Sequence, residues 1–161
     1  MANKKYGMFR SDNMAGTTQG KYLASVRVGE DLQNGSVVAL GAYEVNEREV
    51  RTCTAPDADT KIGALAILGS EEVVANVKYD TVAGFINLKG SVARAYIFEH
   101  GDMFSATAEC FDGTPAVGHT IETLAGTYKM KAVETASGAT VIGECIAVEK
   151  DGPTTWYVVR V

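Results

Sequence analysis

The sequence predicts an all-β protein: a compact sandwich or barrel of short strands, preceded by an extended N-terminal arm. Strand-sized apolar segments recur about every ten residues, which is the spacing found in sandwiches and barrels. Turn residues separate these segments, and glycine (17 residues) supplies them far more often than proline (3 residues). A chain of 161 residues can bury one core without disulfide or metal staples.

The first half of the chain predicts strands at 22–28, 36–40, 43–53 and 62–68. Asn34-Gly35, between the first two of these, is a strong signal for a β-hairpin. One short helix is expected over 70–76, because Ser70 is a candidate N-cap and two acids follow it in the first turn.

The second half predicts further strands at 92–98, 103–111, 119–124, 127–134, 140–149 and 155–161. KIGALAI (61–67) and VIGECIA (141–147) are alike, which is expected if the body repeats one plan. The body over 22–161 is therefore interpreted either as a single sandwich or barrel or as two similar β units that divide near residue 85.

Residues 1–21 are predicted to form the arm, because they are polar and show no periodicity. Residues 1–27 carry a surplus of four positive charges, whereas the whole chain has a net charge of −5. Apolar side chains in a polar arm suit docking on a partner, and basic ones favour an acidic partner. The alternative is that the segment folds back on its own body or joins copies of the chain. The candidate docking residues are Lys4, Lys5, Tyr6, Met8, Phe9 and Arg10.

Motifs for catalysis are missing from the sequence. It has no glycine-rich nucleotide loop, no serine nucleophile elbow and no cysteine–histidine spacing of a zinc site. His100 and His119 lie beside turn glycines, and nothing in the sequence around Cys110 or Cys145 would activate a thiol. We therefore predict that the protein is not an enzyme and holds neither a metal nor a cofactor.

The remaining candidates for chemistry have simpler interpretations. The acid pairs at 57/59, 71/72 and 99/102 are interpreted as solvated charges, which on turns are commoner than acid–base pairs. Trp156 is predicted to anchor a core or an interface rather than to stack on a sugar. The three cysteines, which include Cys53, are expected to be free thiols, because their number is odd and no export signal precedes them.

The net charge and the hydropathy of the chain limit the classes of partner that it can have. A pI near 5.0 does not predict direct binding to nucleic acid, and no apolar run approaches the length of a membrane span.

A polar arm, a β body with glycine turns, and segments such as GSVVALG (35–41), VGHTIETL (117–124) and VIGECIAVE (141–149) occur together here. In this combination the chain resembles the small head decoration, or auxiliary capsid, proteins of tailed bacteriophages. The resemblance implies a non-enzymatic virion protein that lies on the outer capsid surface and stabilises it, after assembly in the host cytoplasm. Its partners would be the major capsid protein lattice and copies of itself, for example in a trimer.

Two other functions stay open from the sequence. One is another phage structural β protein, such as a head fibre base or a tail component. The other is a cellular ligand-binding or carbohydrate-binding β module, which an exposed row of aromatic side chains would favour.

Overall fold

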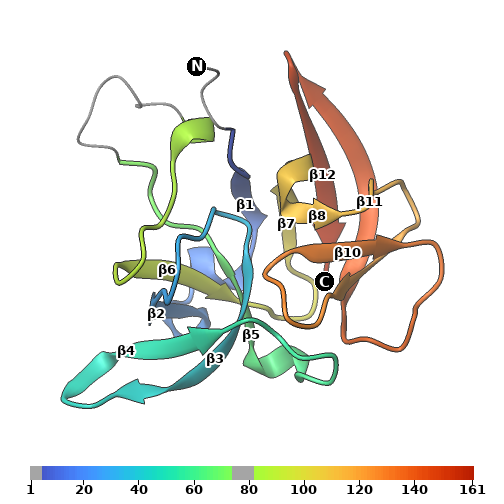
Figure 1. Cartoon of the computed structure of the whole chain (residues 1–161). Coiled ribbons are helices and arrows are strands. Elements are labelled where there is room, and N and C mark those ends of the chain that lie inside the picture. The colour runs from blue at the N-terminus through green and yellow to red at the C-terminus, as the bar shows by residue number, and fades with distance from the viewer. Residues whose placement is uncertain (1–4, 74–81) are drawn as a thin grey trace.

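The computed structural model describes residues 5–73 and 82–161, and within them the prediction of an all-β fold is confirmed (Figure 1). Short 3-10 turns join the strands: η1 (Ala15–Thr17), η2 (Gly20–Tyr22), η3 (Ile62–Ala64), η5 (Val82–Gly84) and η6 (Ala108–Cys110). The strands are β1 (Phe9–Asn13), β2 (Leu23–Arg27), β3 (Val37–Glu44), β4 (Glu47–Thr54), β5 (Leu65–Leu68), β6 (Val92–Ile97), β7 (Met103–Ala106), β8 (Phe111–Asp112), β9 (Thr120–Thr123), β10 (Met130–Val133), β11 (Val141–Asp151) and β12 (Thr154–Arg160).

Five strands close into a barrel in the order β2-β4-β3-β5-β6, with β6 pairing back onto β2. The pair β2–β4 is parallel, and the other pairs in the barrel are antiparallel. A barrel of so few strands has a narrow interior, so small side chains must fill part of it. Ala66, Ala93 and Ala95 do so, together with Val26 and Val38.

The other seven strands form one sheet in the order β1-β7-β12-β11-β9-β10-β8. The long hairpin β11–β12 lies at its centre and projects beyond the body (Figure 1). β8 pairs with β10 in parallel at one edge, and β1 pairs with β7 antiparallel at the other.

The described residues form two hydrophobic clusters, one inside the barrel and a larger one that the barrel and the sheet share, and β5 contributes to both. Ala66 and Leu68 point into the barrel, whereas Leu65 and Ile67 belong to a larger cluster with Phe104 of the sheet. All four residues of β5 are fully buried. A strand covered on both faces is expected to be apolar throughout, which explains the unbroken run at 62–68.

The division into two units differs from the expectation. It falls between the end of β6 and the start of β7, not near residue 85, because β6 closes the barrel. The two units also differ in strand order and closure. KIGALAI covers η3 and most of β5, a short strand that pairs with β3 and β6. VIGECIA lies in the long strand β11, so the two segments do not occupy equivalent positions.

The predicted hairpin at Asn34-Gly35 is wrong, because β2 and β3 are not neighbours in the barrel. The Gly35 N–H instead donates to the Leu68 carbonyl, and the Asn34 amide binds both backbone groups of Ser70 at 2.9 and 3.0 Å. The strand predicted over 43–53 is confirmed for 47–53, which lie in β4, but residues 45 and 46 form the turn of the hairpin between β3 and β4, where Asn46 has a φ of 65°.

The predicted helix at 70–76 is wrong for its first four residues, which are not helical, since Asn34 holds Ser70 beside the end of β5. The rest of that prediction, 74–76, lies outside the described residues. In the described part of the chain, no helix is long and apolar enough to cross a membrane.

Candidate functional site

The predicted docking residues lie along the junction between the barrel and the sheet. Lys4 is outside the described residues; Lys5 and Arg10 are exposed and Tyr6 is half-buried. Met8 is buried. Phe9 is half-buried and its ring packs between Tyr96 of the barrel, at 5.5 Å between centroids, and Phe104 of the sheet, at 6.0 Å. Met8 and Phe9 therefore serve their own core.

Backbone bonds tie this segment to both units. Met8 donates to the Thr107 hydroxyl at 3.0 Å and accepts from the Thr107 N–H at 3.1 Å. On the other side, the Gly7 N–H donates to the Gln33 side chain at 2.8 Å. The expectation of an arm that stands apart from the body is therefore corrected for residues 5–21. The segment folds back on its own body, which is the alternative that the sequence left open.

Three positive charges of residues 1–27 are also matched within the chain. Lys5 pairs with Glu109 at 3.6 Å, and Arg10 pairs with Asp151 of the β11–β12 hairpin at 2.9 Å. Arg27, further along, binds Glu44 of β3 at 2.8 Å. Folding thus brings part of the basic N-terminal charge against acidic residues of the body, although each exposed pair contributes only about 0–1 kcal/mol.

Trp156 is buried, and the Arg10 guanidinium lies 3.7 Å from the centre of its ring. A ring covered in this way cannot stack on a sugar. The interpretation of Trp156 as an anchor is therefore confirmed.

The cysteines and histidines do not form a nucleophilic pair in the structure. Cys110 and Cys145 are buried and all three cysteines are free, with Cys53 half-buried. Burial raises the pKa of Cys110 to about 12 and also raises that of Cys145, so both stay protonated thiols. Cys145 and His119 are joined only through backbone, because the Cys145 sulfur contacts the Ala147 carbonyl at 3.6 Å.

Of the acidic side chains singled out in the sequence, one is buried and accepts backbone hydrogen bonds, and others lie at the surface. Asp102 is buried and accepts from the Ala15 and Glu99 N–H groups at 2.8 and 2.9 Å. Glu71 pairs with Arg94 at the surface, and residues 57 and 59 are exposed. Among residues 5–73 and 82–161, no three His, Cys, Asp or Glu side chains are placed to hold a metal ion.

The hairpin β3–β4 presents apolar side chains that sequence reasoning missed. It extends away from the body (Figure 1), with Tyr43 61% exposed and Val45 90% exposed at its turn. Polar and charged residues surround them, namely Glu44, Asn46, Glu47 and Arg48. The only signal in the sequence was a β-branched residue, Val45, in the place of a turn residue.

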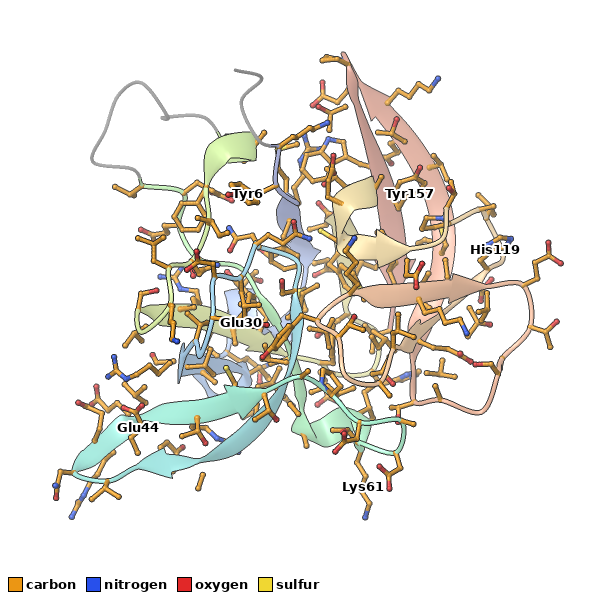
Figure 2. All side chains as sticks on the ribbon, viewed as in Figure 1. Tyr6, Glu30, Glu44, Lys61, His119 and Tyr157 are labelled. Atoms are coloured by element: carbon orange, nitrogen blue, oxygen red, sulfur yellow. The ribbon has the colours of Figure 1, made fainter. Side chains whose placement is uncertain are left out.

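A groove of about 850 Å³ lies on the junction of barrel and sheet. The loop before β10 forms one wall and is tied to the barrel, since the Val37 N–H donates to the Tyr128 carbonyl and the Gly126 N–H donates to the Pro56 carbonyl. Tyr6 and Glu30, which both line this groove, are labelled in Figure 2. Its polar and aromatic lining includes Lys5, Tyr6, Glu30, Asp31, Gln33, Glu109, Asp112, Thr127, Tyr128 and Lys129.

Two groups in the groove have shifted pKa values. Burial alone would raise the pKa of Glu109, but hydrogen bonds from Thr107 and from the Glu109 backbone, with the charge of Lys5, hold it below its ordinary value. One Glu109 oxygen, Oε2, is buried without a hydrogen-bond partner. Burial, and then the negative charge of Glu30, raises the pKa of the Tyr128 hydroxyl.

Comparisons with known proteins give little. No family model matches the chain, and no curated protein matches it in sequence. A solved structure, described as head fiber gp8.5 N base in bacteriophage phi29, is similar with a TM-score of 0.44 and 14% identity, over 85% of this chain and 92% of that one. A likeness at this level assigns no function.

Proposed function

We propose that this protein is a non-enzymatic structural component of a bacteriophage virion, which decorates and stabilises the capsid by binding the lattice of the major capsid protein. The observation that carries the proposal is the hairpin β3–β4 with its exposed Tyr43 and Val45. The resemblance of the sequence to head decoration proteins supplies the partner.

The hairpin has the properties of a contact surface. A valine that is 90% exposed at a turn contributes nothing to the stability of its own fold. When buried completely against a partner, it contributes about 1.5–3 kcal/mol. The Arg51 guanidinium lies 5.6 Å from the centre of the Tyr43 ring and restricts its motion, so less entropy is lost when Tyr43 binds.

The rest of the molecule is a rigid support for this hairpin. β4 pairs with β3 from Ala39 to Glu44, and β5 pairs with the first residues of β3, Val37 to Ala39. Val37 and Val38 lie in the two hydrophobic clusters. A lattice protein needs such a support, because many weak contacts add up only when each copy presents the same geometry.

Co-sedimentation tests the proposal. Capsids assembled from the major capsid protein of the same virus, expanded and undecorated, are mixed with wild-type protein and pelleted. We expect the wild type to pellet with capsids, Val45→Asp to stay in solution, and Val117→Asp to pellet as the wild type does. Val117 is the matched control, since it is also an exposed valine (66%) but lies in the loop before β9.

Each failure has its own meaning. If the wild type does not pellet with capsids, capsid decoration is wrong, and binding to purified tails or head fibres then tests the other phage structural roles. If Val45→Asp pellets normally, the capsid contact lies elsewhere on the body. Light scattering of the free protein measures whether copies associate, as a trimer or otherwise, before they meet the lattice.

A further inference from the structure

We propose that the groove between the barrel and the sheet binds a neutral oligosaccharide chain. This inference concerns a different surface from the hairpin β3–β4 and goes beyond capsid binding. It rests on the shape of the groove, on its two tyrosines and on the mixture of polar groups around them.

The groove has the dimensions of a ligand site. Its volume of about 850 Å³ lies within the range of about 300–1,000 Å³ that small-molecule sites occupy. It is open to solvent rather than enclosed, which suits a chain that continues beyond its bound residues. Its walls come from elements that the shared core and the Val37–Tyr128 backbone bond hold in place, so the site is preformed.

Two tyrosines far apart in the sequence line this groove. Tyr6 comes from the N-terminal segment and Tyr128 from the loop before β10, and both are half-buried. A half-buried tyrosine is held in one orientation while part of its ring stays accessible, and the apolar face of a sugar ring packs on such a surface. The row of aromatic residues that the sequence did not show is therefore partly assembled by the fold.

The polar lining favours a polyol over a charged chain. The groove holds two ammonium groups, Lys5 and Lys129, among four carboxylates, namely Glu30, Asp31, Glu109 and Asp112. A ligand of one sign would meet repulsion as well as attraction at such a surface. Sugar hydroxyls both donate and accept, so they can bind carboxylates, ammonium groups and the Thr127 hydroxyl alike.

Glu109 adds a fixed negative charge to the groove. Its lowered pKa keeps the carboxylate ionised at neutral pH, and its Oε1 lies 3.6 Å from the Lys5 ammonium. Ligand hydroxyls can donate to the exposed part of this carboxylate and can accept from the neighbouring ammonium group.

Titration of the free full-length protein with oligosaccharides tests the proposal. The probes are maltohexaose, cellohexaose and chitohexaose, each up to about 5 mM, and hexalysine is the charged comparison; calorimetry and amide chemical shifts report binding. We expect at least one hexasaccharide to bind and to shift the amides of 127–129, and hexalysine not to bind. We expect Tyr128→Ala to weaken that binding about tenfold or more, and Tyr128→Phe to retain it.

Tyr43→Ala, on the hairpin, is the control and should bind as the wild type does. Melting temperatures show whether Tyr128→Ala remains folded; if it does not, Asp112→Asn, at an exposed position, takes its place, with an expected loss of about tenfold. Two results would overturn the proposal: no hexasaccharide binds the wild type, whether or not hexalysine does, or binding persists unchanged in the folded groove variant. Neither of them depends on capsids, so capsid binding stands or falls separately.

Discussion

Replacing Met14 by alanine shows whether the N-terminal segment belongs to the core of the protein. Met14 is 2% exposed and lies in the larger hydrophobic cluster with Phe104 and Tyr96. Truncation of a buried methionine costs about 2–5 kcal/mol, since the side chain leaves a cavity. In a domain of this size, each kcal/mol lowers the melting temperature by about 2–4 °C. We therefore expect the melting temperature to fall by about 4–20 °C.

Circular dichroism during heating measures this fall, and urea unfolding gives the loss of free energy independently. Val45→Ala is the control, because a side chain that is 90% exposed contributes almost nothing to the folded state. A melting temperature for Met14→Ala within about 2 °C of the wild type's would refute the reasoning. The segment would then be a separate arm, as its polar composition first indicated.

Three further predictions concern buried groups. At pH 8, iodoacetamide should label native protein at Cys53 alone, and mass spectrometry should find three labels after unfolding, since Cys110 and Cys145 are buried; native labelling of either would contradict their burial. Because burial raises the pKa of Cys110 from 9.0 to about 12, its contribution to stability is complete below pH 9 and is lost between pH 9 and 12. Urea titrations at several pH values measure the free energy of unfolding. Between pH 9 and 12 this free energy should fall more steeply in wild type than in Cys110→Ala, by up to about 1.4 kcal/mol per pH unit. Equal slopes in the two proteins would show that Cys110 does not cause the fall. Asp102→Ala removes the acceptor of two backbone N–H groups, those of Ala15 and Glu99. The free energy of unfolding, measured by urea titration, should fall by about 2–4 kcal/mol, and a fall below about 1 kcal/mol would show that water replaces the carboxylate.

The strands were largely predictable because their signal is local. The apolar run at 62–68 contains β5, and the alternation at 22–28 contains β2. A pattern of this kind reports which faces of one segment are buried, and it needs no knowledge of the rest of the chain. The turn at Val45-Asn46 escaped detection because asparagine there adopts a positive φ without a glycine beside it.

The strand partners and the candidate surfaces were not predictable, because they depend on how the barrel closes and on which distant segments the fold brings together. Asn34-Gly35 has the composition of a hairpin turn, yet β2 pairs with β4 and β6 once the barrel closes. Gly35 is needed for another reason as well, since a Cβ there would collide with the sulfur of Cys110. No local pattern could bring Tyr6 and Tyr128 to one groove, or match Arg10 with Asp151.

The position of β1 has a consequence for synthesis on the ribosome. The barrel strands β2 to β6 follow one another along the chain, so the barrel is complete once Ile97 has emerged. β1 precedes them but pairs only with β7, about 90 residues later, which takes about 5–18 s at the usual rates of translation. Throughout that interval Phe9 and Met14 have no sheet to pack against, and the nascent chain presents them to chaperones and to its neighbours. β1 is made before the barrel strands but reaches its place after them, and its Arg10 can pair with Asp151 only when translation has almost reached β12.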